Sequence, residues 1–134
     1  MKILLVDRNR DFLSGYEKLL TADRHEVVTA FDGTQVLTKA AVTRFDLVLM
    51  NERQPRVDSR EIVRYLNEEK IPVVILSEEG ETVMDKFAGM VTEGVLCFPF
   101  EPQEMRNVLA QAEGLPRDER RAQERSEERQ GEEG

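Results

Sequence analysis

Short apolar runs recur along this chain and limit the folds that it can adopt. Four of them are rich in branched side chains and too short for helices: ILLV at 3 to 6, LVLM at 47 to 50, VVIL at 73 to 76 and VLCF at 95 to 98. Residues that are apolar at consecutive positions are typical of strands buried on both faces, as in a parallel sheet covered by helices. HEVVTA, at 25 to 30, is less apolar and predicts an edge strand.

Segments with helical spacing separate these runs, and each carries one apolar stripe. They lie at 12 to 20, 36 to 41, 62 to 66, 83 to 88 and 105 to 112. Alternating strands and helices predict right-handed crossovers and an α/β fold, a doubly wound sandwich around a parallel sheet. In such sheets, chemistry takes place beyond the carboxyl ends of the strands. Those ends are Val6, Met50, Leu76 and Phe98.

The composition fits one soluble globular domain. The chain has 134 residues, of which 40% are apolar and 34% are charged, and a domain of this length needs no disulfide or metal to fold. Cys97 is the single cysteine and lies in an apolar run, so we expect a buried, unreactive thiol and a reducing cytoplasm. His25, the only histidine, has no companion ligand nearby and is expected to be a surface residue.

Charge and hydropathy argue against two classes of partner. The net charge of −8 would repel a phosphate backbone, and no basic cluster stands apart from acids, so we expect no direct nucleic-acid binding. No segment approaches the ~20 apolar residues that cross a bilayer, and the N-terminal apolar run is too short for a signal peptide. We therefore expect a cytoplasmic protein with no membrane partner.

The chain changes character near its end. After Leu115 it has no large apolar residue and mixes arginines with acids, so this part cannot join a core. The predicted division is a folded domain at 1 to 113 and a charged linker or tail at 114 to 134.

Residues with polar or special roles stand where the predicted strands end. The first strand is followed by Asp7 and Arg8, the third by Asn51, the fourth by Ser77, and the fifth by Phe98 and Pro99. With ILLVD, FDLVLMNERQP, IPVVILS and FPFEP in this order, the sequence resembles the receiver domain of two-component response regulators over residues 2 to about 113. The resemblance implies a flavodoxin-like sheet with strand order 2-1-3-4-5 and five helices.

The resemblance also implies which positions would carry the family's chemistry. A receiver phosphorylates itself on an aspartate after the third strand, and acids after the first strand hold Mg²⁺. A hydroxyl after the fourth strand and a lysine before the final proline contact the phosphoryl oxygens. These positions are Asn51, the pair Asp7 and Arg8, Ser77, and Phe98 before Pro99. The family's aromatic switch position is Val95, and the Phe98-Pro99 bond is expected to be cis.

Much of that chemistry is absent. A carboxamide has no anionic oxygen, so Asn51 cannot form an ordinary acyl phosphate. Mg²⁺ is usually held through carboxylates, and Asp7 alone is expected to bind it weakly or not at all. We expect Arg8 to pair with Asp7 in the space of the ion. Phe98 removes the cation that would meet a phosphate, so neither enzymatic activity nor a cofactor is expected.

Other interpretations of single residues stay open. Asn51 could be an introduced change that blocks phosphorylation. The role of Asp7 could be limited to capping a loop, and that of Ser77 to capping the next helix. Glu52 is rejected as a substitute acceptor, because strand alternation points its side chain away from that of Asn51.

The sequence favours a degenerate receiver, or pseudo-receiver, that acts as a phosphorylation-independent protein-interaction module. The alternatives are a receiver blocked only at Asn51, or a flavodoxin-like domain that binds a small ligand. The resemblance implies a signalling partner or second copy at the fourth helix, fifth strand and fifth helix. Around 80 to 91 the apolar arc is wider than a core-facing stripe, which predicts a partner face with Met84, Phe87 and Met90, the last at an exposed rim. The alternative is that Met90 covers a gap in the core.

Overall fold

The computed structural model describes residues 1–79 and 82–114 and shows a parallel sheet between two layers of helices. The strands are β1 (Lys2–Val6), β2 (Glu26–Ala30), β3 (Leu47–Asn51), β4 (Val73–Ser77) and β5 (Gly94–Cys97); the helices are α1 (Arg10–Ala22), α2 (Gly33–Val42), α3 (Ser59–Glu68), α4 (Thr82–Lys86) and α5 (Pro102–Gly114). The strand order is β2-β1-β3-β4-β5, so the predicted fold class and topology are confirmed. The predicted tail, beyond Gly114, lies outside the described residues.

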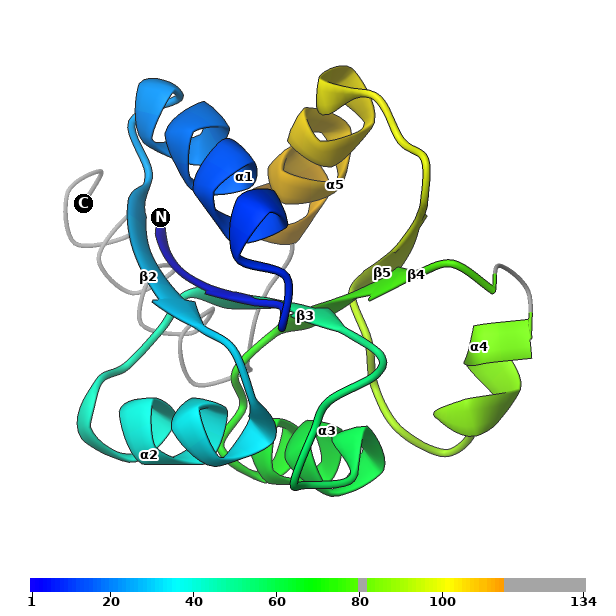
Figure 1. The fold of residues 1–134 in the computed structure, drawn as a ribbon. Coiled ribbons are helices and arrows are strands. Elements are labelled where there is room, and N and C mark those ends of the chain that lie inside the picture. Colours follow the sequence, from blue (N-terminus) through cyan, green and yellow to red (C-terminus); the bar gives the residue numbers. More distant parts are fainter. Residues whose placement is uncertain (80–81, 115–134) are drawn as a thin grey trace, which may run out of the picture.

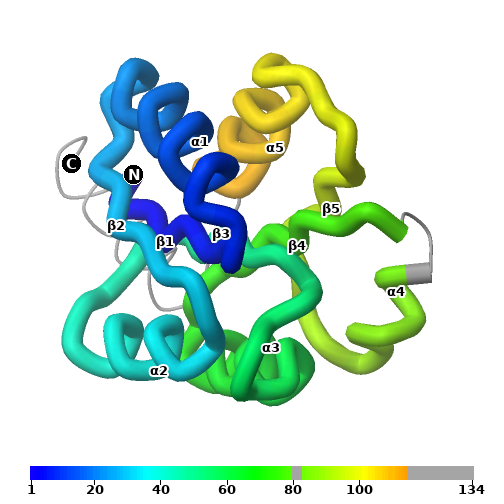
Figure 2. The backbone as a smooth tube through the Cα atoms, viewed as in Figure 1, coloured from blue at the N-terminus to red at the C-terminus, as the bar shows by residue number. Residues whose placement is uncertain are grey.

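Helices cover both faces of the sheet. Figure 1 shows α1 and α5 on one face and α2 and α3 on the other, and the backbone tube in Figure 2 shows the same layers. Successive strand residues alternate between two apolar cores. Leu49 and Leu76 pack on the α1–α5 side, whereas Met50 and Ile75 pack on the α2–α3 side. The sheet is therefore buried on both faces, as the consecutive apolar residues predicted.

Side-chain caps start the helices close to the strand ends. Asn9 Oδ1 accepts hydrogen bonds from the backbone N–H groups of Asp11 and Phe12 at the start of α1. Asp32 and Asp58 cap α2 and α3 in the same way. The cap at Asn9 leaves only a short loop between β1 and α1, which holds its side chains at the edge of the sheet.

The segment between β4 and β5 differs from the prediction. A helix was expected near 80 to 91, but α4 ends at Lys86, and a turn with Gly89 at φ 83° follows. Glycine adopts positive φ without steric cost and commonly ends helices. Phe87 is only 3% exposed, so the prediction that it belongs to an exposed partner face is wrong. Met90 is half-buried against the core, which agrees with the alternative that it covers a gap there and not with an exposed rim. Met84, by contrast, is 52% exposed.

Cys97 is exposed, so the prediction of a buried thiol is also wrong. It is the last residue of β5, which is an edge strand. Alternation points Cys97 to the face opposite the buried Leu96, where α4 is too short to cover it. The Phe98-Pro99 peptide bond is cis, as the resemblance implied. No helix among the described residues has both the length and the apolar character that crossing a membrane requires.

Candidate functional site

Strand alternation sorts the residues at the carboxyl edge of the sheet onto two faces. Asp7, Asn51 and Phe98 each follow, by two positions, a strand residue of the α1–α5 core. Ser77 and Glu52 instead follow residues of the α2–α3 core. Because side chains two positions apart share a face of a strand, the predicted site residues divide into two groups.

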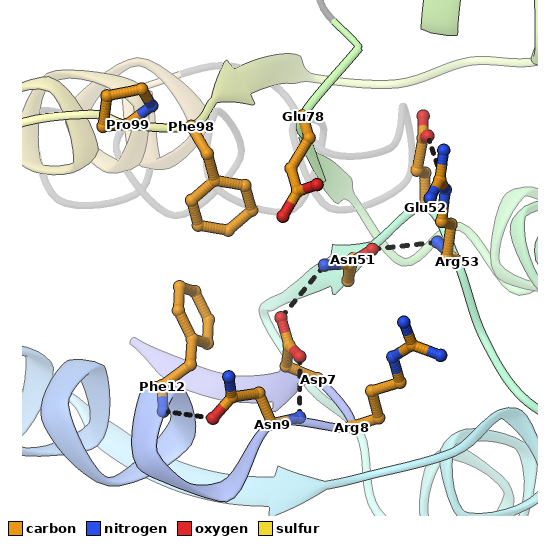
Figure 3. Close-up of a pocket in the computed structure, with 10 residues that line it drawn as sticks. All are labelled: Asp7, Arg8, Asn9, Phe12, Asn51, Glu52, Arg53, Glu78, Phe98 and Pro99. Atoms are coloured by element: carbon orange, nitrogen blue, oxygen red, sulfur yellow. Dashed lines mark hydrogen bonds and ion pairs between the residues drawn. The ribbon is translucent and has the colours of Figure 1, made fainter.

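Asp7 and Asn51 form the centre of the first group. The Asp7 side chain is 4% exposed, and its Oδ1 accepts a hydrogen bond from Asn9 N at 2.8 Å. Its Oδ2 accepts from Asn51 Nδ2 at 3.0 Å. Asn51 Oδ1 in turn accepts from Arg53 N at 2.9 Å (Figure 3). Asp7 thus does cap its loop, and the amide of Asn51 is fixed by one donated and one accepted bond.

Arg8 does not pair with Asp7, and that prediction is wrong. Its side chain is exposed, and Figure 3 shows the guanidinium directed away from the Asp7 carboxylate. Within residues 1–79 and 82–114, Arg8 makes no ion pair with any other residue. The reason is that Asn9 and Asn51 already donate to both Asp7 oxygens, which leaves a guanidinium little to gain there.

Ser77 belongs to the second group and is fully buried. Its hydroxyl donates to Glu52 Oε2 at 3.0 Å and accepts from Glu79 N at 2.9 Å. It therefore caps the turn after β4 instead of α4, which begins further along at Thr82. The hydroxyl is committed to the face of the sheet opposite Asn51.

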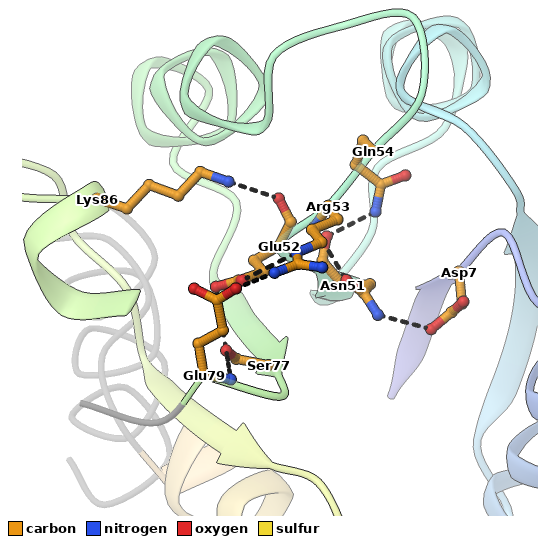
Figure 4. A network of polar contacts seen from close by, with 8 residues as sticks. All are labelled: Asp7, Asn51, Glu52, Arg53, Gln54, Ser77, Glu79 and Lys86. Atoms are coloured by element: carbon orange, nitrogen blue, oxygen red, sulfur yellow. Dashed lines mark hydrogen bonds and ion pairs between the residues drawn. The ribbon is translucent and has the colours of Figure 1, made fainter. Parts of the chain in front are cut away.

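Glu52 links several elements in a way that the sequence reasoning missed. It is 3% exposed, and Arg53 Nε lies 3.7 Å from its Oε1. Arg53 also forms an ion pair with Glu79, and Lys86 of α4 donates to the Glu52 backbone oxygen at 3.1 Å (Figure 4). Strand alternation was the available signal, since it places Glu52 and Ser77 on the same face.

An aromatic cluster occupies the position that the resemblance assigns to a lysine. The Phe98 ring lies edge-on to Phe12, with centroids 5.2 Å apart, and 5.1 Å from the Phe100 ring. Tyr16 completes the cluster through contacts with Phe12 and Phe100. Burial raises the pKa of Tyr16, and the nearby Glu101 carboxylate raises it further. This wall of the site is therefore aromatic and carries no cation.

A cavity of about 340 Å³ opens above Asp7 and Asn51. The side chains around it include the rings of Phe12 and Phe98, the carboxylates of Asp7, Glu52 and Glu78, the amides of Asn9 and Asn51, and two arginines (Figure 3). The resemblance implies Mg²⁺ here, but the side chains present do not fit it. Each Asp7 oxygen already accepts one hydrogen bond, Asn51 is neutral, and the described residues contain no group of three His, Cys, Asp or Glu side chains that could hold a metal.

Comparisons with known proteins agree with this fold. A family model for the response regulator receiver domain matches residues 3–110. The alkaline phosphatase synthesis transcriptional regulatory protein PhoP of Bacillus subtilis is 29% identical over 108 residues, which cover 78% of this chain and 45% of PhoP. The transcriptional regulatory protein PrrA of Mycobacterium leprae is 30% identical over 118 residues, or 87% of this chain and 50% of PrrA. The chain spans about half the length of these curated relatives.

Solved structures give the same result. The chemotaxis response regulator CheY4 of Vibrio cholerae matches with a TM-score of 0.76 and 25% identity over 83% of this chain and 97% of CheY4. The receiver domain of the sensor histidine kinase PA1611 of Pseudomonas aeruginosa has the same fold, with a TM-score of 0.75 and 24% identity over 85% of this chain and 98% of that domain. From the family match and the strand order, we conclude that the chain belongs to the response regulator receiver domain family of two-component signalling.

Proposed function

We propose that this chain is a pseudo-receiver, a cytoplasmic protein-interaction module that works without phosphorylation, enzymatic activity, bound Mg²⁺, or a nucleic-acid or membrane partner. The observation that carries this proposal is the amide of Asn51, which donates to Asp7 at 3.0 Å at the place where the family has its phosphoacceptor. An amide in this position is a poor nucleophile toward phosphorus. The proposal therefore treats the site as a structural element.

Three further features support the loss of phosphotransfer. Arg8 brings a positive charge to the metal-binding loop, Phe98 replaces the phosphate-contacting lysine with a ring, and Ser77 is bonded to Glu52 on the other face. In comparison, the PA1611 receiver domain was determined with a magnesium ion coordinated in its active site cleft. Restoring chemistry to this chain would require several separate changes.

The experiment is treatment of the full chain with acetyl phosphate, or with beryllofluoride, in the presence of Mg²⁺. We expect no added phosphoryl mass by intact-mass spectrometry and no Mg²⁺-dependent change in the amide NMR spectrum. A comparison variant that combines Arg8→Asp, Asn51→Asp and Phe98→Lys tests whether the scaffold itself can support the reaction. A phosphorylated species in the unaltered chain would contradict the proposal.

A second candidate is a receiver blocked only at Asn51, and it is favoured by the buried Asp7 carboxylate, which keeps the acid that the family has after the first strand. The single substitution Asn51→Asp separates the two. The pseudo-receiver proposal predicts little labelling of that variant by acetyl phosphate, whereas the second candidate predicts strong, Mg²⁺-dependent labelling. The triple variant shows how much labelling the scaffold supports when positions 8 and 98 are changed as well.

The proposed partner surface comprises α4, β5 and α5, where a signalling protein or a second copy of the chain would bind. Its exposed apolar side chains are Met84 and Val91, which are 52% and 65% exposed. Asn67 of α3 holds the backbone of Val91 with two hydrogen bonds of 2.9 Å. A surface whose backbone is fixed before binding loses less conformational freedom when a partner arrives.

A further inference from the structure

Two opposite charges face the cavity of Figure 3 without pairing with each other. Arg8 and Glu78 both line it, and their side chains approach it from different sides of Asn51. Both residues are exposed, and neither has a hydrogen bond or ion pair from its side chain within the part of the chain that the structure describes. The cavity therefore offers one free cation and one free carboxylate at separate places.

The other charged groups around the cavity are already occupied. Both oxygens of Asp7 accept hydrogen bonds. Arg53 pairs with Glu79 and lies near Glu52, whose Oε2 accepts from a buried hydroxyl. This arrangement leaves Arg8 and Glu78 as the groups available to an occupant.

The third feature of the cavity is its aromatic wall. The half-buried rings of Phe12 and Phe98 line the end of the cavity away from the arginines (Figure 3). Their edge-on contact at 5.2 Å holds both rings in place. Along the cavity, apolar rings, then a carboxylate, then a guanidinium follow one another.

We propose that this cavity binds a free α-amino acid with an apolar or aromatic side chain. Such a molecule carries the three complementary groups on one carbon atom. Its side chain packs against Phe12 and Phe98, its ammonium group meets Glu78, and its carboxylate meets the Arg8 guanidinium, whose planar donors match a carboxylate. A volume of about 340 Å³ lies at the small end of ligand pockets, which suits a metabolite of this size. The proposal does not depend on the partner surface or on the absence of phosphotransfer.

Fragment ligands test the proposal directly. The full chain is titrated with L-phenylalanine and L-leucine by calorimetry and amide NMR, beside 3-phenylpropanoate, phenethylamine and glycine, which lack the ammonium, the carboxylate and the side chain respectively. We expect L-phenylalanine to bind roughly tenfold more tightly than each fragment, because each fragment loses one charged or apolar contact. Amide shifts should concentrate at residues 8, 51, 78 and 98.

Charge-removing variants assign the two ends of the ligand. Arg8→Gln should lower the affinity for L-phenylalanine to that for phenethylamine and leave phenethylamine binding unchanged. Glu78→Gln should lower the affinity for L-phenylalanine to that for 3-phenylpropanoate and leave 3-phenylpropanoate binding unchanged. Arg64→Gln, at an exposed position of α3 outside the cavity, is the matched control and should change nothing.

Three outcomes would overturn the proposal. They are the absence of binding by either amino acid at millimolar concentration, equal binding of the amino acid and its fragments, and equal effects of Arg8→Gln and Arg64→Gln. The altered side chains are exposed, so the variants should fold, and thermal melting checks that they do. None of these results bears on phosphorylation, which the mass measurement tests separately.

Discussion

At the scale of single residues, the difference between an amide and a carboxylate governs this site. Asn51 donates to Asp7 and accepts from Arg53 N, and no ionised aspartate could do both. A buried carboxylate needs a donor, and the amide of Asn51 supplies one. The asparagine thus stabilises the carboxyl edge of the sheet.

The first residue-scale prediction is that Asn51→Asp lowers the free energy of unfolding by ~1 to 3 kcal/mol at pH 7 without Mg²⁺, because a buried acceptor loses its donor. Two facing carboxylates raise the pKa of the pair in the folded state above that in the unfolded chain. The deficit should therefore be largest above the folded-state pKa and disappear as the pH falls below the unfolded value. Urea unfolding at pH 7 and at pH 5 measures it.

The matched control is Asn9→Asp, because an aspartate at that cap still accepts from Asp11 N and Phe12 N. Its stability should stay close to that of the unaltered chain at both pH values. An Asn51→Asp deficit that does not shrink on acidification would contradict the repulsion argument.

The second residue-scale prediction concerns His25, whose Nδ1 lies 3.0 Å from the Met1 amino group. Burial lowers the pKa of His25, and the N-terminal ammonium lowers it further. His25 therefore binds a proton more readily in the unfolded chain than in the folded one. The free energy of unfolding should fall as the pH drops below the ordinary histidine pKa. Thermal melts across that range should show a small loss, since the ring is partly exposed, and His25→Gln should reduce it.

At the scale of elements, close approach between α2 and the segment before α3 fixes one side of the fold. Gly33 begins α2, and a Cβ there would lie 2.7 Å from Val57 Cβ and 2.8 Å from Ile62 Cδ1. Real Cβ contacts are longer, so this position requires the absence of a side chain. Gly15 in α1 has no such neighbour, because an added Cβ there would meet nothing within 4 Å.

We therefore predict opposite effects for two identical substitutions. Gly33→Ala should lower the free energy of unfolding by ~1 to 3 kcal/mol through overpacking. Gly15→Ala should raise it by ~0.5 to 1 kcal/mol, because alanine is the better residue inside a helix. Chemical denaturation of both variants measures the difference, and equal effects would show that α2 can move away from Val57 freely.

The strand pattern and the strand-end residues could be read from the sequence because both depend on local rules. Two-residue alternation and consecutive apolar positions determine which strands are buried and which face a side chain joins. The same rule pointed Glu52 away from Asn51 and is confirmed. The rule also places Ser77 and Glu52 on one face of the sheet, where they form a hydrogen bond, because each lies two positions after a strand residue of the same core.

The failures concern features that apolar spacing alone does not determine. Apolar spacing could not show that Gly89 would end the fourth helix early and place Phe87 in the core. Cys97 lies in an apolar run, but its exposure depends on how far α4 extends. Arg8 forms no ion pair with Asp7, whose carboxylate already accepts a hydrogen bond from Asn51 on another strand.

At the scale of the whole molecule, two exposed apolar side chains lie on the β4 to β5 side, where the partner surface is proposed. Met84 is 52% exposed and Val91 is 65% exposed, whereas Met90 packs against the core. Isolated exposed apolar residues are common. Met84 and Val91 differ from such isolated residues in two ways. Hydrogen bonds fix the backbone at Val91, and the resemblance implies that the family uses this side for binding.

The whole-molecule prediction is that Met84→Lys leaves the melting temperature nearly unchanged and weakens self-association or partner capture, measured by light scattering and pull-down. Met90→Lys, the comparison variant, should instead lower the free energy of unfolding by ~1 to 3 kcal/mol, because it places an ammonium group against the core. Undiminished association of Met84→Lys would exclude this surface as the binding face.

The packing of Phe98 has a consequence for how such a domain can evolve. Its ring contacts those of Phe12 and Phe100 at centroid distances of 5.2 and 5.1 Å. A mutation that placed a lysine at this position would lose both contacts, at ~0.5 to 1.5 kcal/mol each. Under the proposed function, a gain of phosphotransfer would therefore begin with a loss of stability, and selection would more readily recruit the site for a new purpose than build phosphate chemistry into it.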